Sequence, residues 1–147
     1  MKRLLMCIMA LLLFCGAAFA QRGLNCYPVF KGKIVPTKRM VITQARGGSM
    51  ATYKLDYYHS VQFQTDEATA GKVAELILAD AVEAQSAETE MTGELLTYAL
   101  VQPTPYARVR RYLCYQARPV GAAWIITILY LEGSATLEDL RSMFEKQ

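Results

Sequence analysis

Apolar and polar residues alternate along several stretches of the chain, and this pattern predicts β-strands. Residues 39–46 form the first stretch, which two glycines end. In residues 57–64, Val61 and Phe63 alternate with polar neighbours, as in a half-buried strand. Further strands are predicted at residues 95–101, 108–117 and 123–131. The last of these is almost wholly apolar, which is typical of a central strand covered on both faces.

Two other stretches have the spacing of helices. Apolar residues recur every three or four positions from residue 66 to about residue 86, directly after Thr65, which we expect to cap the helix. Near the end of the chain, Thr136 and Asp139 form a variant of the capping box before a short amphipathic helix. The polar, acidic residues 86–93 between the long helix and the third strand are predicted to form a loop.

This order of elements predicts an α+β fold. We expect a mainly antiparallel sheet of about five strands, with one long and one short helix packed on one face. A chain of 147 residues is long enough for one domain. We place this domain at residues 21–147 and expect residues 21–38, which contain two glycines and two prolines, to be an irregular leader.

The first twenty residues have the pattern of a secretory signal peptide. Two basic residues precede an apolar run that ends at Phe14, and Ala18-Phe19-Ala20 is a small-x-small cleavage site. An uncleaved anchor is the weaker alternative because the apolar stretch is short and no basic cluster follows it. A lipoprotein signal is weaker still because the bulky Phe14 precedes Cys15. We therefore expect a periplasmic or secreted protein with no stable membrane span after cleavage.

Cleavage at this point changes the charge of the working protein. Two of the 16 basic residues leave with the signal, so 14 remain against 13 acidic residues and the net charge is +1 in place of +3. The charges are segregated: residues 21–55 have no acid, residues 56–94 are acidic, and residues 95–131 are again basic. This pattern indicates either a basic surface for an anionic envelope component or neutralisation within the fold. It lacks the excess of positive charge that nucleic-acid binding needs.

Arginines and an aromatic residue mark one candidate binding surface. Arg108, Arg110 and Tyr112 lie on one predicted strand, and Arg46 precedes a glycine turn. A partner protein or a second copy of the chain could meet such a surface at the face or the edge of the sheet. The alternative is that these charges only protect a sheet edge from aggregation.

Few residues are suited to catalysis. His59 is the only histidine, which excludes multi-histidine metal sites, and nothing in the sequence indicates a cofactor. We expect His59 to be a half-exposed strand residue, and a catalytic pair of His59 with Cys114 is the weaker reading. Cys26 and Cys114 are the two cysteines that follow the signal, so they form either one disulfide or two unpaired thiols.

Four short runs of residues carry a resemblance to a known family. They are Pro28-Val29-Phe30-x-Gly32-Lys33, Tyr53-x-Leu55-x-Tyr57-Tyr58-His59-Ser60, Arg111-Tyr112-Leu113-Cys114-Tyr115 and Tyr130-x-Glu132-Gly133. Together with the signal peptide, they resemble a family of small exported proteins of unknown function from Bacteroidales. The resemblance implies an exported, periplasmic and non-enzymatic role and supplies no catalytic residues.

Two functional hypotheses remain. The first is an exported, non-enzymatic binding or interaction module that acts in the periplasm or cell envelope. The alternative is a small exported enzyme with a site around His59 or Cys114. A binding module should show an exposed apolar or basic patch, whereas an enzyme should show convergent polar groups in a cleft.

Overall fold

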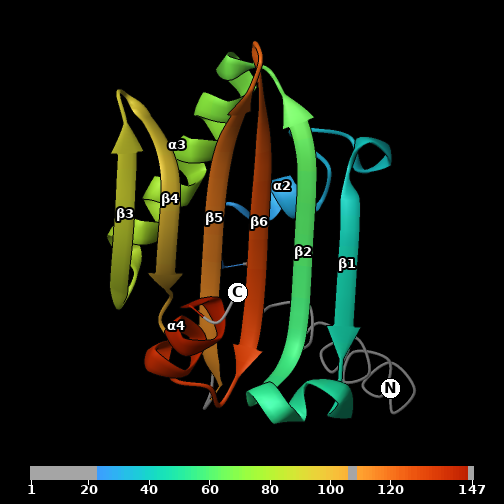
Figure 1. The fold of residues 1–147 in the computed structure, drawn as a ribbon, viewed down its shortest axis with the longest axis vertical. Helices are drawn as coiled ribbons and strands as arrows, with labels where there is room; N and C mark the ends of the chain where they lie inside the picture. The colour runs from blue at the N-terminus through green and yellow to red at the C-terminus, as the bar shows by residue number, and fades with distance from the viewer. Residues whose placement is uncertain (1–22, 106–108, 146–147) are drawn as a thin grey trace, which may run out of the picture.

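The computed structural model describes residues 23–105 and 109–145 and shows an α+β fold built on one antiparallel sheet of six strands (Figure 1). Across the sheet the order is β1-β2-β6-β5-β4-β3. The strands are β1 (Val41–Arg46), β2 (Leu55–Thr65), β3 (Ser86–Thr92), β4 (Leu95–Gln102), β5 (Arg110–Val120) and β6 (Ala123–Gly133). The apolar strand β6 lies in the interior of the sheet, as its composition predicts.

The strand that the sequence did not predict is β3, which lies where we expected an acidic loop. Every residue of β3 is exposed, so no pattern of buried and exposed positions marks it. It pairs with β4 through a two-residue turn at Gly93 and Glu94, in which Gly93 has a φ of 64°. The loop prediction was wrong because an edge strand can be held by backbone hydrogen bonds alone.

The helices cover both faces of the sheet. The four-residue α2 (Tyr27–Phe30) and the long α3 (Glu67–Glu83) lie behind the sheet in Figure 1, on what we call the α3 face. The third helix, α4 (Leu137–Glu145), lies in front of it, on the α4 face. The prediction that both main helices share one face was therefore wrong.

Alternation along the central strands explains why two helices can pack on opposite faces. Leu113 and Tyr115 of β5 belong to the core under α3. Tyr112, the residue before Leu113, belongs with Leu131 of β6 to a separate cluster under α4, which contains Leu140. Successive side chains of a strand point to opposite faces, so one strand supplies both cores.

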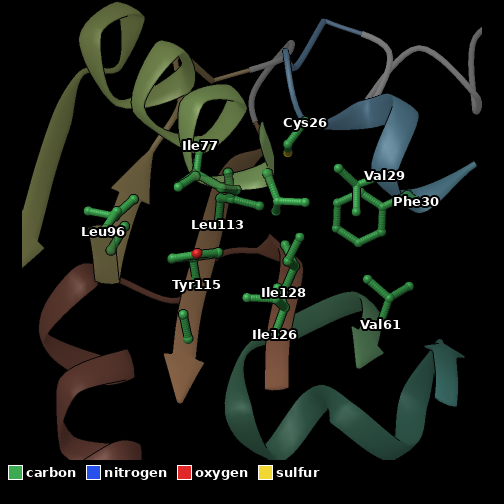
Figure 2. Packing of buried hydrophobic residues seen from close by; sticks show 14 of the residues in the cluster. Cys26, Val29, Phe30, Val61, Ile77, Leu96, Leu113, Tyr115, Ile126 and Ile128 are labelled. Carbon is green, nitrogen blue, oxygen red and sulfur yellow. The ribbon is translucent and has the colours of Figure 1, made fainter. Parts of the chain in front are cut away.

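The larger core lies between α3, α2 and the sheet (Figure 2). Ile77 of α3 is fully buried above β5, and Asp66 caps this helix by accepting the Thr69 N–H at 2.8 Å. The cap is thus one residue later than the predicted Thr65. Val29 and Val35, at 0% and 2% exposed, also belong to this core. Much of residues 23–38 is irregular, as predicted, but this segment is a packed part of the fold.

Candidate functional site

A groove opens on the α4 face between the short helix η2 (Gly48–Tyr53) and α4. Its volume of about 680 Å³ lies within the usual range of small-ligand sites. Most of the side chains that line it are apolar. The lining residues are Met50, Thr52, Tyr53, Lys54, Leu55, Tyr58, Leu129, Leu131, Asp139, Ser142 and Met143.

The floor of the groove is a well-packed part of the sheet. Leu55 and Leu131 are 6% and 2% exposed. Tyr112 lies beside Leu131 in the register of β5 and β6, and its hydroxyl donates to the carbonyl oxygen of Ala135 at 2.6 Å. Because Tyr112 is 0% exposed, it does not belong to a binding surface as we expected. It instead supports the groove and holds the chain that leads into α4.

Lys54, one of the residues that line the groove, has an unusual backbone conformation. It has a φ of 58°, and among the described residues it is the only non-glycine with a positive φ. Its carbonyl oxygen accepts the N–H groups of Ser134 and Ala135, both at 3.0 Å. This carbonyl lies so close to Gly133 that a Cβ at Gly133 would overlap it. The start of β2 and the end of β6 are therefore fastened together beneath η2.

The wall on the α4 side depends on the predicted capping box. The Asp139 N–H donates to Thr136 Oγ1 at 3.1 Å, and the Thr136 N–H donates to Asp139 Oδ2 at 2.8 Å. These hydrogen bonds, with a smaller contribution from Lys54, lower the pKa of Asp139 below its ordinary value. Lys54 Nζ lies 3.6 Å from Asp139 Oδ2, so an ion pair links the two walls of the groove.

The arginines expected to form one basic surface do not lie together. Arg110 donates from Nη1 to the carbonyl oxygen of Ser134 at 2.7 Å, near α4. Arg46 stacks over the ring of Tyr57 at 4.7 Å, and Tyr57 packs against the core of the α3 face. Arg108 lies outside the described residues. The structure thus places Arg46 and Arg110 on opposite faces of the sheet.

His59 and Cys114 also lie on opposite faces. His59 is 7% exposed and so is buried, not half-exposed as we expected; its ring lies 4.9 Å from that of Phe30 on the α3 face. Burial lowers its pKa below the ordinary value of 6.5. Cys114 lies on the α4 face, because Leu113 and Tyr115 on either side of it belong to the core under α3. A catalytic pair of these two residues is therefore contradicted by the fold.

The same arrangement contradicts a disulfide between Cys26 and Cys114. Cys26 is fully buried in the core of the α3 face, and both thiols are free. The sheet separates the two sulfur atoms. Burial raises the pKa of both thiols, in Cys114 to about 12, so neither has the lowered pKa of a reactive cysteine.

On the α3 face, a cluster of polar side chains forms hydrogen bonds within the cluster and to nearby backbone. The Tyr130 hydroxyl, fully buried, donates to Glu132 Oε1 at 2.6 Å. Arg111, which is paired with Glu132 in the register of β5 and β6, donates to the carbonyl oxygen of Thr104 from Nε and Nη2. Since these groups satisfy one another and nearby backbone, we interpret the cluster as structural.

Residues 23–105 and 109–145 contain neither a cluster of metal ligands nor a membrane-spanning helix. No group of three or more histidine, cysteine, aspartate or glutamate side chains is placed to hold a metal ion. No helix in this part of the chain is long and apolar enough to cross a membrane.

Comparison with known proteins identifies the family of this chain. Residues 13–144 match the model of a family described as a family of unknown function, DUF6108. The chain belongs to this family. No curated protein and no solved structure matches the chain.

Sequence reasoning missed most of this groove. Its residues come from three separate parts of the chain, namely residues 50–58, 129–131 and 139–143. One signal was present: Met50 and Tyr53 are large apolar residues between the stretches 39–46 and 57–64, where we predicted no regular element. Nothing in the sequence shows that this segment faces α4, because that contact depends on the strand order.

Proposed function

We propose that this DUF6108 protein is an exported, non-enzymatic binding module that holds an apolar segment of a partner protein in the groove. The observation that carries this proposal is the groove itself, with apolar walls on η2 and α4 above a buried, well-packed floor. Met50 and Met143 lie on opposite walls. Methionine side chains adapt to differently shaped apolar partners, and Tyr53, at 54% exposed, offers a large contact surface at the rim.

The chemistry of the groove supports binding over catalysis. Its one carboxylate, Asp139, is engaged by the capping box and by Lys54. Neither His59 nor Cys114 lines the groove. A catalytic site would need a nucleophile or a proton-transfer group aimed at a bound substrate.

Export is supported by the sequence alone. The basic, apolar and small-residue parts of residues 1–20 have the order of a signal peptide. The resemblance to exported Bacteroidales proteins agrees with this order. We therefore place the binding module in the periplasm or at the cell envelope of such a bacterium, with Gln21 as its first residue.

Site-specific photo-crosslinking in cells tests the groove. A photoreactive amino acid replaces Thr52, an exposed residue of the groove, and in a second strain it replaces Val82, which is 86% exposed on α3. We expect a discrete crosslinked protein from position 52 and none from position 82. Mass spectrometry then identifies the crosslinked protein and the apolar segment that entered the groove.

A groove variant shows whether that product depends on the site. Met143→Glu places a charge in the wall of the groove, and Val82→Glu places the same charge on the far side of the molecule. We expect the first substitution to abolish the product and the second to leave it unchanged, while circular dichroism shows both variants folded. Absence of a product from position 52, or equal products from both positions, would refute the proposal.

A further inference from the structure

The groove between η2 and α4 contains two of the four methionines of residues 21–147. Met50 and Met143 line its opposite walls. The other two lie elsewhere: Met40 packs against the core of the α3 face, and Met91 is 50% exposed on the edge strand β3. Methionine sulfur is thus concentrated in the proposed binding site.

Both groove methionines are accessible to small solutes. Each is half-buried, since it packs against the cluster under α4 and also lines the groove. Hydrogen peroxide is little larger than water, and a groove of about 680 Å³ admits it. An accessible methionine thioether is readily oxidised to a sulfoxide.

The two cysteines compete poorly for a peroxide. A thiol reacts as its thiolate, and burial raises the pKa of both Cys26 and Cys114, that of Cys114 to about 12. Methionine has no proton to lose, so its reactivity depends mainly on access. In the folded protein we therefore expect the accessible methionines to be oxidised before the cysteines.

A sulfoxide at either position would make the groove more polar. Its oxygen is a strong hydrogen-bond acceptor, whereas the thioether sulfur is a weak one. Leu55 and Leu131 in the floor have no donor for it, and Lys54 already pairs with Asp139. An apolar segment offers no donor either, so its binding would remove the water that solvates this oxygen, at a cost in binding free energy.

We propose that Met50 and Met143 are oxidation sites through which hydrogen peroxide weakens the binding of the apolar segment. In each reaction the sulfur attacks one peroxide oxygen, an S–O bond forms and the O–O bond breaks. The sulfur loses two electrons, the peroxide gains them, and the second oxygen leaves as water with both hydrogens. The inference rests on the proposed function, because it describes how binding in the groove is regulated.

Peptide mass spectrometry of the purified, peroxide-treated protein tests the chemistry without a partner. We expect one added oxygen at Met50 and one at Met143, while circular dichroism shows that the protein stays folded. Met91, which is exposed outside the groove, measures the dose. If Met50 and Met143 stay unmodified at a dose that oxidises Met91 completely, the proposal is overturned.

Photo-crosslinking in cells from position 52 tests the effect on binding. The crosslinked product of each peroxide-treated strain is compared with that of the same strain before treatment. In the unchanged protein we expect it to fall about tenfold, because a desolvated polar group weakens binding by about that factor. The double variant Met50→Leu, Met143→Leu has no thioether in the groove, so its product should stay nearly constant. Met91→Leu is the matched control and should lose its product as the unchanged protein does.

A second double variant, Met50→Gln with Met143→Gln, introduces polar groups into the groove without an oxidant. Its product in untreated cells should be about tenfold lower than that of the unchanged protein. Circular dichroism of the purified variant checks that it is folded. A full yield of product from this variant would show that polar groups at the two positions do not weaken binding, which overturns the proposal.

The untreated cells separate this inference from the function on which it rests. If the unchanged protein gives no product from position 52 before peroxide is added, the proposed function fails and this inference fails with it. If the product forms and persists after both groove methionines have been oxidised, only this inference is overturned. An equal loss of product in the leucine double variant also overturns it, because the peroxide would then act at another site.

Discussion

The carboxylate of Asp80 accepts the backbone N–H of Cys26 at 3.0 Å and so fastens the N-terminal segment to α3. The same carboxylate accepts the N–H of Asn25 at 2.6 Å. Asp80 is only 4% exposed, and burial raises its pKa above the ordinary value of 3.8 although these hydrogen bonds oppose that shift. A buried carboxylate thus satisfies two backbone donors of a segment that has little regular structure of its own.

Asp80→Ala should destabilise the protein by about 2 kcal/mol, because it leaves two N–H groups without an acceptor. Urea denaturation followed by circular dichroism measures the free energy of unfolding. Glu83→Ala is the control: Glu83 is exposed and accepts a long hydrogen bond from Asn25 Nδ2, at 3.4 Å. We expect it to change stability by less than about 0.5 kcal/mol. Equal effects of the two substitutions would show that the Asp80 hydrogen bonds do not hold the segment.

His59 should make stability fall on acidification below pH 6.5. Its pKa is lowered in the folded protein by burial, so the unfolded chain binds a proton more readily. The contribution of His59 is complete above the ordinary pKa of 6.5 and is lost as the pH falls from 6.5 towards the lowered pKa. The measurement is the free energy of unfolding at a series of pH values.

The variant His59→Phe isolates this effect because His59 is the only histidine in the chain. The decrease in stability just below pH 6.5 should be absent from the variant, while the carboxylate-dependent decrease at lower pH remains. An unchanged pH profile in His59→Phe would contradict the assignment.

How far the sequence predicted the fold depended on where side chains are buried. Strand β6 was found because its run of apolar residues is covered on both faces, and α3 because its apolar residues line one side. The same run in β6 already argued against placing both helices on one face, since a strand that is apolar on both sides needs cover on both. β3 could not be found in this way, because none of its side chains is buried.

Both Cys26 and Cys114 should be free thiols in the purified protein. The sheet lies between them, so an oxidising compartment cannot join them without unfolding. In the folded protein both should react slowly with a thiol reagent, because burial raises the pKa of each. After unfolding without a reductant, mass spectrometry should show both labelled. Labelling that requires a reductant would reveal a disulfide and contradict the structure.

Tyr115→Phe should stabilise the protein or leave it unchanged. The hydroxyl of Tyr115 is buried and has no hydrogen-bond partner within the described residues, and burial raises its pKa to about 12. A buried hydroxyl without a partner costs about 1–3 kcal/mol, and phenylalanine keeps the ring that packs under α3. Thermal unfolding should show the gain.

Tyr112→Phe is the matched control on the same strand. Its hydroxyl does have a partner, the carbonyl oxygen of Ala135. This second substitution should therefore destabilise the protein by about 1 kcal/mol. A loss of stability in Tyr115→Phe as large as in Tyr112→Phe would mean that the Tyr115 hydroxyl has a partner after all.

The groove was harder to predict than the fold, because its parts meet only through the strand order. Thr136 and Asp139 were recognised as a helix cap from their spacing, but the contact of Asp139 with Lys54 requires β2 and β6 to be neighbours. Tyr112 shares a face with Arg110 as alternation predicts, yet it is covered by α4. Alternation assigns a side chain to a face and does not say what covers that face.

Gly133→Ala should destabilise the protein and disturb the groove. A Cβ at this position would overlap the carbonyl oxygen of Lys54, which also accepts the N–H groups of Ser134 and Ala135. The backbone would have to move where β2, β6 and the start of α4 are fastened together. We expect a loss of about 2–3 kcal/mol in urea denaturation, because overpacking against backbone is relieved only by such a shift.

Gly71→Ala is the matched control, since it adds the same methyl group where no described atom beyond the neighbouring residues and the backbone of its own helix lies within 4 Å. Gly71 lies inside α3, where alanine favours the helix by about 0.5–1 kcal/mol, so this variant should be more stable than the unchanged protein. Opposite signs for the two substitutions would show that the contact at Lys54, and not the methyl group, causes the loss. If Gly133→Ala were as stable as the unchanged protein, the junction beneath the groove would be looser than the structure shows. The floor of the groove would then be less tightly packed than we describe, and only the apolar residues of its walls would support the proposed binding site.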